Sequence, residues 1–445
     1  MTDTTGTAAP DPSEILRSKN FVAVLLLAAL VGIVVSLVSW GFLESVHQIQ
    51  RWIFTDLASA LGFDSTPSWW GVPVCTIAGI PVAFAIAKLP GRGGHVPAHG
   101  LQPGAAAPNE VPGVLLAALA TLGLGLVLGP EAPLMAIGSG VAVWCVQRVK
   151  KDAPPTLALV IGAAGAFAAI SVIFGSPVVG AVIIIEATGL GGGTLPLILI
   201  PGLIAAGIGS LVFLGMADWS GLPTSAYSLP PLHLPALGTP TVAEIAWAIA
   251  LGVAAAVLTY PASGIGIRVS RFVEQRPFIV IPMAGCVVGL LAFAFAHITN
   301  QPANAVLFSG QDALTGLMSG ATTLAVGTLI WLLVFKSIAW GVSLGAFRGG
   351  PTFPAMFIGA TGGIAAAHLP GLSVPAAVPV AMGAMIAAFL RLPLSAVIIA
   401  IAMNASAGSG VDPLIIVGVV TAYLVALALE GRLGPPASRA SGALT

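Results

Sequence analysis

Long apolar stretches fill most of this chain, and short polar or proline-rich segments separate them. Stretches able to form helices run over about 21–43, 69–88, 113–147, 156–187, 194–217, 242–267, 277–297, 321–347, 353–367, 375–390, 393–406 and 413–430. A helix needs about 20 residues to cross a bilayer upright, and several stretches are longer or shorter than that. The pattern therefore predicts an all-α polytopic membrane protein with tilted, broken and half-length helices.

One broken motif occurs twice, each time inside an apolar stretch. The copies are Gly129-Pro130-Glu131-Ala132-Pro133 and, 221 positions later, Gly350-Pro351-Thr352-Phe353-Pro354, and each continues to a Met, an Ile and a Gly. Helix breakers within a membrane are tolerated where the freed backbone is buried in protein or lines a polar cavity. Paired interruptions in two halves indicate a transport site between inverted repeats.

The two halves share more than this motif. Residues 29–32 resemble 250–252, and 177–183 resemble 393–398, at nearly the same displacement. We therefore predict an N-terminal tail at 1–20, a first membrane repeat at 21–217, an inter-repeat loop at 218–240, a second repeat at 241–430 and a C-terminal tail at 431–445.

Loop charge favours inverted over parallel repeats. Segment 148–151 carries three basic residues, and its counterpart near 369–374 carries none. Segment 268–276 also carries three, whereas its counterpart near 47–55 has only Arg51. Because basic loops face the cytoplasm, the counterparts lie on opposite sides of the membrane. The same rule, applied to Arg17 and Lys19, predicts a cytoplasmic N-terminus in a multi-pass protein of the cell inner membrane.

The composition supports a membrane protein and excludes other classes. The chain of 445 residues is 57% hydrophobic and 7% charged, with a mean hydropathy of +1.03, whereas a soluble protein is about a quarter charged. Its net charge of +0 argues against nucleic-acid binding. Cys75, Cys145 and Cys286 lie in apolar runs without metal-ligand spacing, so we expect no metal and no cofactor.

Two carboxylates stand alone in apolar surroundings. Glu131 is the sole charge between Glu110 and Arg148, and Glu186 is the sole charge in a long run of its own. An ionisable group at such a place is costly, so a function is the default hypothesis. The alternatives are that Glu131 caps the helix starting at Pro133, and that Glu186 bonds a neighbouring backbone or hydroxyl group.

Three cations also lie in or next to apolar stretches. Lys336 and Arg348 are interpreted as structural or vestibule charges, and Arg391, at a helix break, as either structural or functional.

The repeated motif favours an anion over a cation. A helix that begins within the membrane presents unpaired N–H groups and the positive end of its dipole. Two such ends, one from each half, form an anion site without a buried Lys or Arg. A carboxylate beside them, such as Glu131, occupies the site itself and has to move or be protonated before an anion enters. Helix C-termini at the same breaks would favour cations instead.

At these residues the chain resembles the chloride channel and chloride/proton antiporter (CLC) family, over about 20–430. Residues 129–133 are similar to the family's Gly-Arg-Glu-Gly-Pro motif, with Glu131 in the place of the gating glutamate. Residues 348–354 are similar to Gly-Gly-x-Phe-x-Pro, 174–187 to the segment with the internal glutamate pair, and 93–97 more weakly to Gly-Ser-Gly-Ile-Pro. The motif sequences most resemble those of a little-characterised bacterial branch of ion-transport proteins. The resemblance implies a homodimer with a separate anion pathway in each subunit.

The chain departs from the family's pattern at several positions. The proton-transferring internal glutamate is matched by Ala187, with Glu186 one position earlier, and the central serine is matched by Gly94. The central tyrosine has no match around 432–440. Pro351 falls where the family directs a backbone N–H to the ion, and proline has none, although Thr352 beside it adds a hydroxyl.

The resemblance gives a set of candidate residues. Glu131 is the gate, Glu186 a possible step of a proton path, and the anion-binding candidates are Gly94, His95, Ala132, Pro351, Thr352 and Phe353, together with the N–H of Glu131 itself. His95 and His99 could titrate near neutral pH; alternatively, both are solvated loop residues.

The expected function is transmembrane transport of chloride or another small anion, through a channel-like pathway in each subunit gated by Glu131. The alternatives are a chloride/proton antiporter that uses Glu186, a fluoride exporter, an intramembrane enzyme, and a structural or receptor role. The chain has no His-Glu-x-x-His motif, and Ser139 has no evident base partner in its own stretch.

Overall fold

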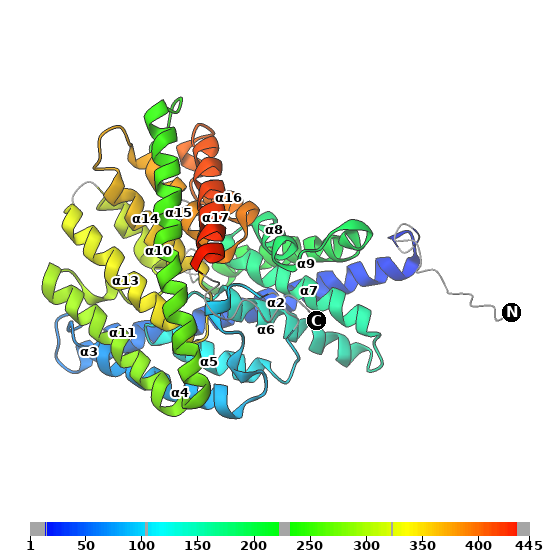
Figure 1. Cartoon of the computed structure of the whole chain (residues 1–445). Helices are drawn as coiled ribbons and strands as arrows, with labels where there is room; N and C mark the ends of the chain where they lie inside the picture. Colours follow the sequence, from blue (N-terminus) through cyan, green and yellow to red (C-terminus); the bar gives the residue numbers. More distant parts are fainter. Residues whose placement is uncertain (1–13, 15, 103–105, 222–231, 322–323, 434–445) are drawn as a thin grey trace.

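The computed structural model describes residues 14, 16–102, 106–221, 232–321 and 324–433. Nearly all of the regular structure in these residues is helical (Figure 1). The first half comprises α2 (Lys19–Arg51), a π-helical turn η1 (Trp52–Asp56), α3 (Leu57–Ala60), α4 (Gly71–Lys88), η2 (Pro90–Gly93), η3 (Pro97–His99), α5 (Val111–Gly123), α6 (Glu131–Val149), α7 (Pro155–Phe174), α8 (Pro177–Thr188), η4 (Gly192–Thr194) and α9 (Leu195–Ser220).

The second half repeats much of this order. It comprises α10 (Val242–Gln275), α11 (Pro277–Thr299), η6 (Ala303–Ala305), α12 (Gln311–Ser319), α13 (Val326–Ala346), α14 (Thr352–Ala366), α15 (Val374–Leu390), α16 (Pro393–Met403), η7 (Ala405–Ala407) and α17 (Asp412–Leu433). In the described part of the chain, nine helical segments are long and apolar enough to cross a membrane, and five shorter apolar helices accompany them. The prediction of a polytopic all-α protein with half-length helices is confirmed.

The predicted long stretches contain the breaks that the prolines and glycines require. The stretch 113–147 is two helices, because α5 ends at Gly123 and α6 begins only at Glu131. The stretch 156–187 is also two helices. Gly175 ends α7 in the left-handed conformation, with φ of 60°, and Pro177 starts α8 behind the N-cap Ser176. Each break frees backbone groups inside the molecule.

Helix packing is duplicated between the halves. In the first half α2 packs on α7 and α9, α7 on α9, and α6 on α7; in the second half α10 packs on α15 and α17, α15 on α17, and α14 on α15. Figure 1 shows α10 and α17 standing side by side. Gly32 of α2 lies directly against Ala205 of α9, and Gly252 of α10 lies against Gly418 of α17 in the same way. Small residues at these crossings let the helix backbones approach closely.

The broken helices α14 and α15 of the second half are deeply buried. Every residue of α15 from Ala376 to Leu390 is buried, and so are the first ten residues of α14, Thr352 to Thr361. The start of α14, where the second broken motif lies, is therefore held inside protein rather than exposed to lipid.

Candidate functional site

The two broken motifs meet in the structure. Gly129 donates its N–H to the carbonyl oxygen of Gly350 at 2.7 Å, and Gly350 donates back to the carbonyl oxygen of Gly129 at 2.6 Å. This reciprocal antiparallel pair joins the residues that precede α6 and α14. The N-termini of the two helices are consequently held next to each other, as the repeated motif predicts.

The two helix starts have the same local geometry. Pro130 caps α6 with φ of −84° and ψ of −7°, and Pro351 caps α14 with φ of −87° and ψ of −13°. The first turns of a helix leave N–H groups without intrahelical partners. Prolines at the cap and at the third position remove two of those donors from each helix. What remains is the N–H pair of Glu131 and Ala132 on α6 and the pair of Thr352 and Phe353 on α14.

The Glu131 side chain crosses from one helix to the other. Its carboxylate Oε1 accepts a hydrogen bond from the N–H of Thr352 at 2.5 Å. The side chain is 1% exposed, and Oε2 has no hydrogen-bond partner among the described residues. The negative charge therefore lies at the start of α14, and Glu131 does more than cap its own helix.

Glycines make room for this carboxylate. A Cβ atom on Gly350 would overlap the Glu131 carboxyl group, and one on Gly129 would overlap both that group and the Phe353 ring. Phe353 in turn stacks on Phe174 with ring centroids 5.5 Å apart. The glycines of the repeated motif are needed here for space, in addition to turning the chain.

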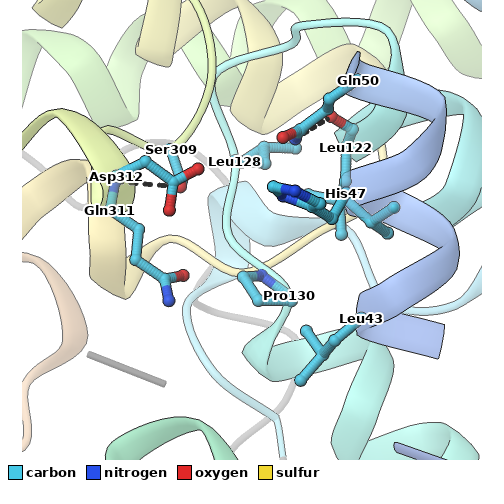
Figure 2. Close-up of a pocket in the computed structure, with 10 residues that line it drawn as sticks. Leu43, His47, Gln50, Leu122, Leu128, Pro130, Ser309, Gln311 and Asp312 are labelled. Atoms are coloured by element: carbon cyan, nitrogen blue, oxygen red, sulfur yellow. Dashed lines mark hydrogen bonds between the residues drawn. The ribbon is translucent and has the colours of Figure 1, made fainter. Parts of the chain in front are cut away.

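A small cavity of about 50 Å³ adjoins the start of α6 (Figure 2). Pro130 forms part of its wall. Figure 2 shows His47 and Gln50 of α2 on one side, and Ser309, Gln311 and Asp312 on the other. Burial raises the pKa of Asp312, and the charge of His47 opposes that rise. Sequence reasoning did not find this cavity, because its two walls are more than 250 positions apart.

A second cavity, of about 470 Å³, adjoins the residues before α14. Its described lining is Ile86, Gly91, Arg92, Gly94, His95, Val96, His99, Gln102, Ser270, Val273, Glu274, Gly345 and Arg348. Gly94 and His95, two of the predicted anion-binding residues, therefore lie in a real cavity. They share it with Arg348, which stands two positions before Gly350.

The loop below Arg348 is shaped by glycines. Gly94 has φ of 100° and ψ of −173°, a conformation that side-chain-bearing residues rarely adopt. Gly93 lies close to the Arg348 side chain: a Cβ atom on Gly93 would be 3.5 Å from Cγ of Arg348. Burial lowers the pKa of His95; Glu110 opposes this shift and Arg348 reinforces it. His95 is therefore held neutral at pH 7.

Glu186 has a different role from Glu131 in the structure. Its carboxylate accepts hydrogen bonds from the N–H of Leu394 at 2.9 Å and from the N–H and Oγ of Ser395, both at 2.6 Å. These donors belong to the first turn of α16. Glu186 of the first half thus caps a helix of the second half, in agreement with the alternative that it bonds neighbouring backbone and hydroxyl groups.

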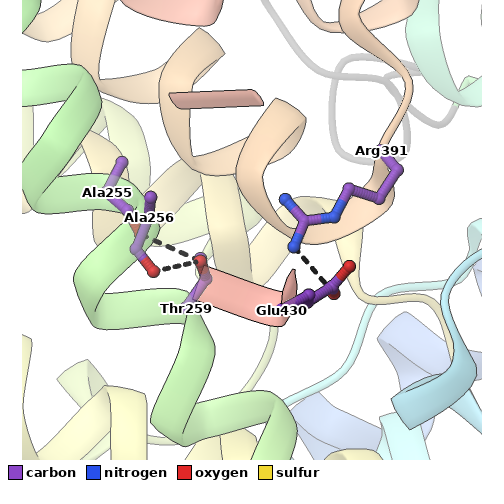
Figure 3. Close-up of polar contacts among 5 residues, drawn as sticks. All are labelled: Ala255, Ala256, Thr259, Arg391 and Glu430. Carbon is purple, nitrogen blue, oxygen red and sulfur yellow. Dashed lines mark hydrogen bonds and ion pairs between the residues drawn. The ribbon is translucent and has the colours of Figure 1, made fainter. Parts of the chain in front are cut away.

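Two further cations, Arg391 and Lys336, also have structural partners. Arg391 forms an ion pair with Glu430 at 2.8 Å (Figure 3). Lys336 is completely buried, and its Nζ donates to the carbonyl oxygens of residues 305–308 at 2.9 to 3.3 Å. The same ammonium lies 4.5 Å from the centre of the Phe357 ring of α14. Lys336 therefore ties the segment before the small cavity to the helix that carries Thr352.

The remaining predicted residues are placed as follows. Ala132, Thr352 and Phe353 lie at the two helix starts, with Pro351 as the cap of α14. The segment 432–440, in which the sequence has no match for the family's central tyrosine, lies mostly outside the described residues. The residue that sequence reasoning undervalued is Arg348, and its position directly before the second broken motif was the available signal.

Paired helix starts buried between two packed halves, with membrane-length helices around them, define a polytopic membrane transport protein. A family model described as voltage gated chloride channel matches residues 96–427, which is well over half of the chain. The chain therefore belongs to the voltage gated chloride channel (CLC) family, as the sequence resemblance indicated.

Similar proteins agree with this family. YfeO of Salmonella newport (strain SL254), whose name assigns it provisionally to ion transport, is 29% identical over 373 residues, or 82% of this chain and 85% of that protein. A slow cyanobacterial Cl⁻/H⁺ antiporter matches the fold with a TM-score of 0.73 at 20% identity, over 92% of this chain and 95% of the other. A CLC-type fluoride/proton antiporter gives 0.67 at 18% identity, over 91% and 95%.

Proposed function

We propose that this protein transports chloride across the membrane through a pathway that passes between the starts of α6 and α14, with Glu131 as its gate. One observation carries the proposal: the Glu131 carboxylate accepts the Thr352 N–H at the start of α14. A carboxylate bound there occupies the position at which backbone donors and two helix dipoles attract an anion. It acts as a tethered competitor of the transported ion.

Transport requires the carboxylate to leave. When Glu131 swings away or is protonated, the N–H groups of Glu131, Ala132, Thr352 and Phe353 become available to an anion. These donors carry partial charges only, so the ion is bound weakly enough to move on. The small cavity beside Pro130 and the large cavity beside Gly94 and Arg348 supply the polar approaches to this point.

We propose a passive pathway rather than coupled exchange. The antiporters above share the fold at 20% identity or less, which does not transfer their coupling to this chain. The carboxylate of Glu186, the candidate for a proton path, accepts three hydrogen bonds from α16. The proposal further includes a homodimer with one pathway per subunit, and an N-terminus on the cytoplasmic side.

The test is ion flux from proteoliposomes containing the purified protein. Chloride release and proton movement are recorded together in the wild type, Glu131→Gln and Glu244→Gln. Glu131→Gln should raise chloride flux and weaken its dependence on pH, because a neutral amide competes poorly with the anion. Glu244→Gln is the matched control, since Glu244 is also a buried helix-capping carboxylate but lies at the start of α10.

Three results would overturn parts of this proposal. Equal flux in wild type and Glu131→Gln at every pH would remove Glu131 from the gate. Uphill proton movement driven by a chloride gradient would replace the passive pathway with exchange. Fluoride release with no chloride release would change the ion.

A further inference from the structure

The large cavity carries a fixed positive charge at its inner wall. Arg348 is 5% exposed and lines the cavity, two positions before Gly350 of the paired glycines. Its Nε donates to the carbonyl oxygen of Arg92 at 3.4 Å, and its Nη1 donates to the carbonyl oxygen of Phe347 at 3.0 Å. Both bonds go to backbone, so the plane of the guanidinium is fixed without any acidic partner.

These bonds leave part of the guanidinium uncommitted. An Arg side chain carries five N–H donors. Two of them are used by the backbone carbonyls, and the structure records no hydrogen bond for Nη2 within the described residues. A buried cation with unused donors that faces a cavity is suited to bind an anion there.

The rest of the lining supports the same sign of charge. Arg92, His95 and His99 join Arg348 on the loop side, and Gln102 and Ser270 add neutral polar groups. Glu274, on α10, is the one acidic side chain among the described lining residues, and it is exposed. Glu110, the N-cap residue of α5, does not line the cavity, but its charge opposes the lowering of the His95 pKa.

The cavity is built for more than a monatomic ion. Its volume of about 470 Å³ lies within the roughly 300–1,000 Å³ of small-molecule sites. Gly94, one of the lining residues, offers no hydroxyl to a single small ion. A guanidinium edge instead matches two oxygen atoms of a planar anion through parallel hydrogen bonds.

We propose that Arg348 forms the capture site of this cavity for planar oxyanions of the carboxylate and nitrate class, ahead of the helix starts. This inference rests on the proposed anion transport and names a ligand class for it. The anion binds at the uncommitted edge of Arg348 and then passes to the weaker donors of α6 and α14. The full charge captures the ligand, and the partial charges beyond it let the ligand leave.

Binding of formate and nitrate to the full-length protein in detergent, compared with chloride, tests this site by titration calorimetry. Arg348→Lys keeps the positive charge but loses the pair of parallel N–H donors of the guanidinium. It should weaken formate and nitrate binding roughly tenfold, as expected for losing one charge-assisted hydrogen bond, and should change chloride binding much less. An equal loss for all three anions would show that Arg348 contributes charge alone, which overturns the oxyanion preference.

A second variant keeps the test decisive if Arg348→Lys does not fold. Glu274→Gln removes the exposed acidic side chain that lines the same cavity and should strengthen binding of both oxyanions severalfold. Unchanged binding in Glu274→Gln would overturn the assignment of this cavity. Wild-type protein that binds and transports chloride but neither oxyanion would refute the inference while leaving the proposed function intact; protein that transports no anion would refute the proposed function itself.

Discussion

The N–H of Thr352 and the carboxylate Oε1 of Glu131 lie 2.5 Å apart although 221 positions separate the two residues in the chain. This bond crosses from the second half of the molecule to the first. It places a negative charge at the start of a buried helix, where the exposed donors of that helix stabilise it.

Gly350→Ala should open the gate by a steric route. A Cβ atom at this position overlaps the Glu131 carboxyl group, so the carboxylate has to leave its place on Thr352. Losing a hydrogen bond to a charged group is worth about 1.5–3 kcal/mol, so we expect chloride flux to rise on the order of tenfold. Flux from proteoliposomes measures the effect.

Two comparisons isolate the cause. Gly207→Ala, in α9, is the control because a Cβ atom there meets nothing within 4 Å. In a Glu131→Ala background, Gly350→Ala should add little, since no carboxylate remains to be displaced. Equal increases with and without Glu131 would contradict the steric explanation.

Glu186→Gln should weaken the protein without changing transport. The amide cannot accept from all three α16 donors as the carboxylate does. Losing a helix cap costs about 1 kcal/mol, so the thermal unfolding midpoint in detergent should fall while chloride and proton fluxes stay the same. Ser395→Ala removes one donor, and its effect should not add to that of Glu186→Gln. A selective loss of proton movement would instead place Glu186 on a proton path.

Lys336→Met should be strongly destabilising. It leaves the carbonyl oxygens of residues 305–308 buried without their ammonium donor. Breaking a buried charged contact by removing one partner costs about 3–5 kcal/mol. Denaturant or thermal unfolding should show this loss, whereas Lys88→Met, at the exposed end of α4, should show almost none. A small effect at Lys336 would mean that water satisfies these carbonyls.

Anion binding should strengthen in acid through His95. Burial holds its pKa below the ordinary 6.5, so the ring is neutral at pH 7 and gains a proton only below pH 6.5. The added charge then faces the cavity that holds Arg92, Arg348, His99 and Glu274. Anion titrations at several pH values should show tighter binding as pH falls, and His95→Gln should remove that increase.

The stability of the fold should change in the opposite sense. The unfolded chain takes up the His95 proton at a higher pH than the folded protein does, so acid favours unfolding below pH 6.5. His95→Gln should therefore reduce the loss of stability in acid. If His99→Gln rather than His95→Gln flattens the binding profile, the titrating group has been assigned to the wrong histidine.

The sequence determined the membrane class, the helical architecture and the importance of one carboxylate. Apolar stretches of membrane length can only be helical in lipid, because each backbone group needs a partner. The repeated Gly-Pro motif indicated two broken helices, and the isolation of Glu131 in apolar sequence marked it as a functional candidate. These conclusions depend on local composition and spacing, which are visible in the linear sequence.

Tertiary structure decided which partner each charged group has. The sequence left open whether Glu131 occupies a site between two helix starts or caps one helix, and in the structure its carboxylate accepts the N–H of Thr352 on α14. It also left the role of Glu186 open, and in the structure that carboxylate accepts hydrogen bonds from α16. The sequence left Arg348 as either a structural or a vestibule charge, and the fold places it on a cavity shared with Gly94 and α10. Hydrogen bonds and cavities depend on contacts between residues hundreds of positions apart, and a pattern along the chain contains no measure of those distances.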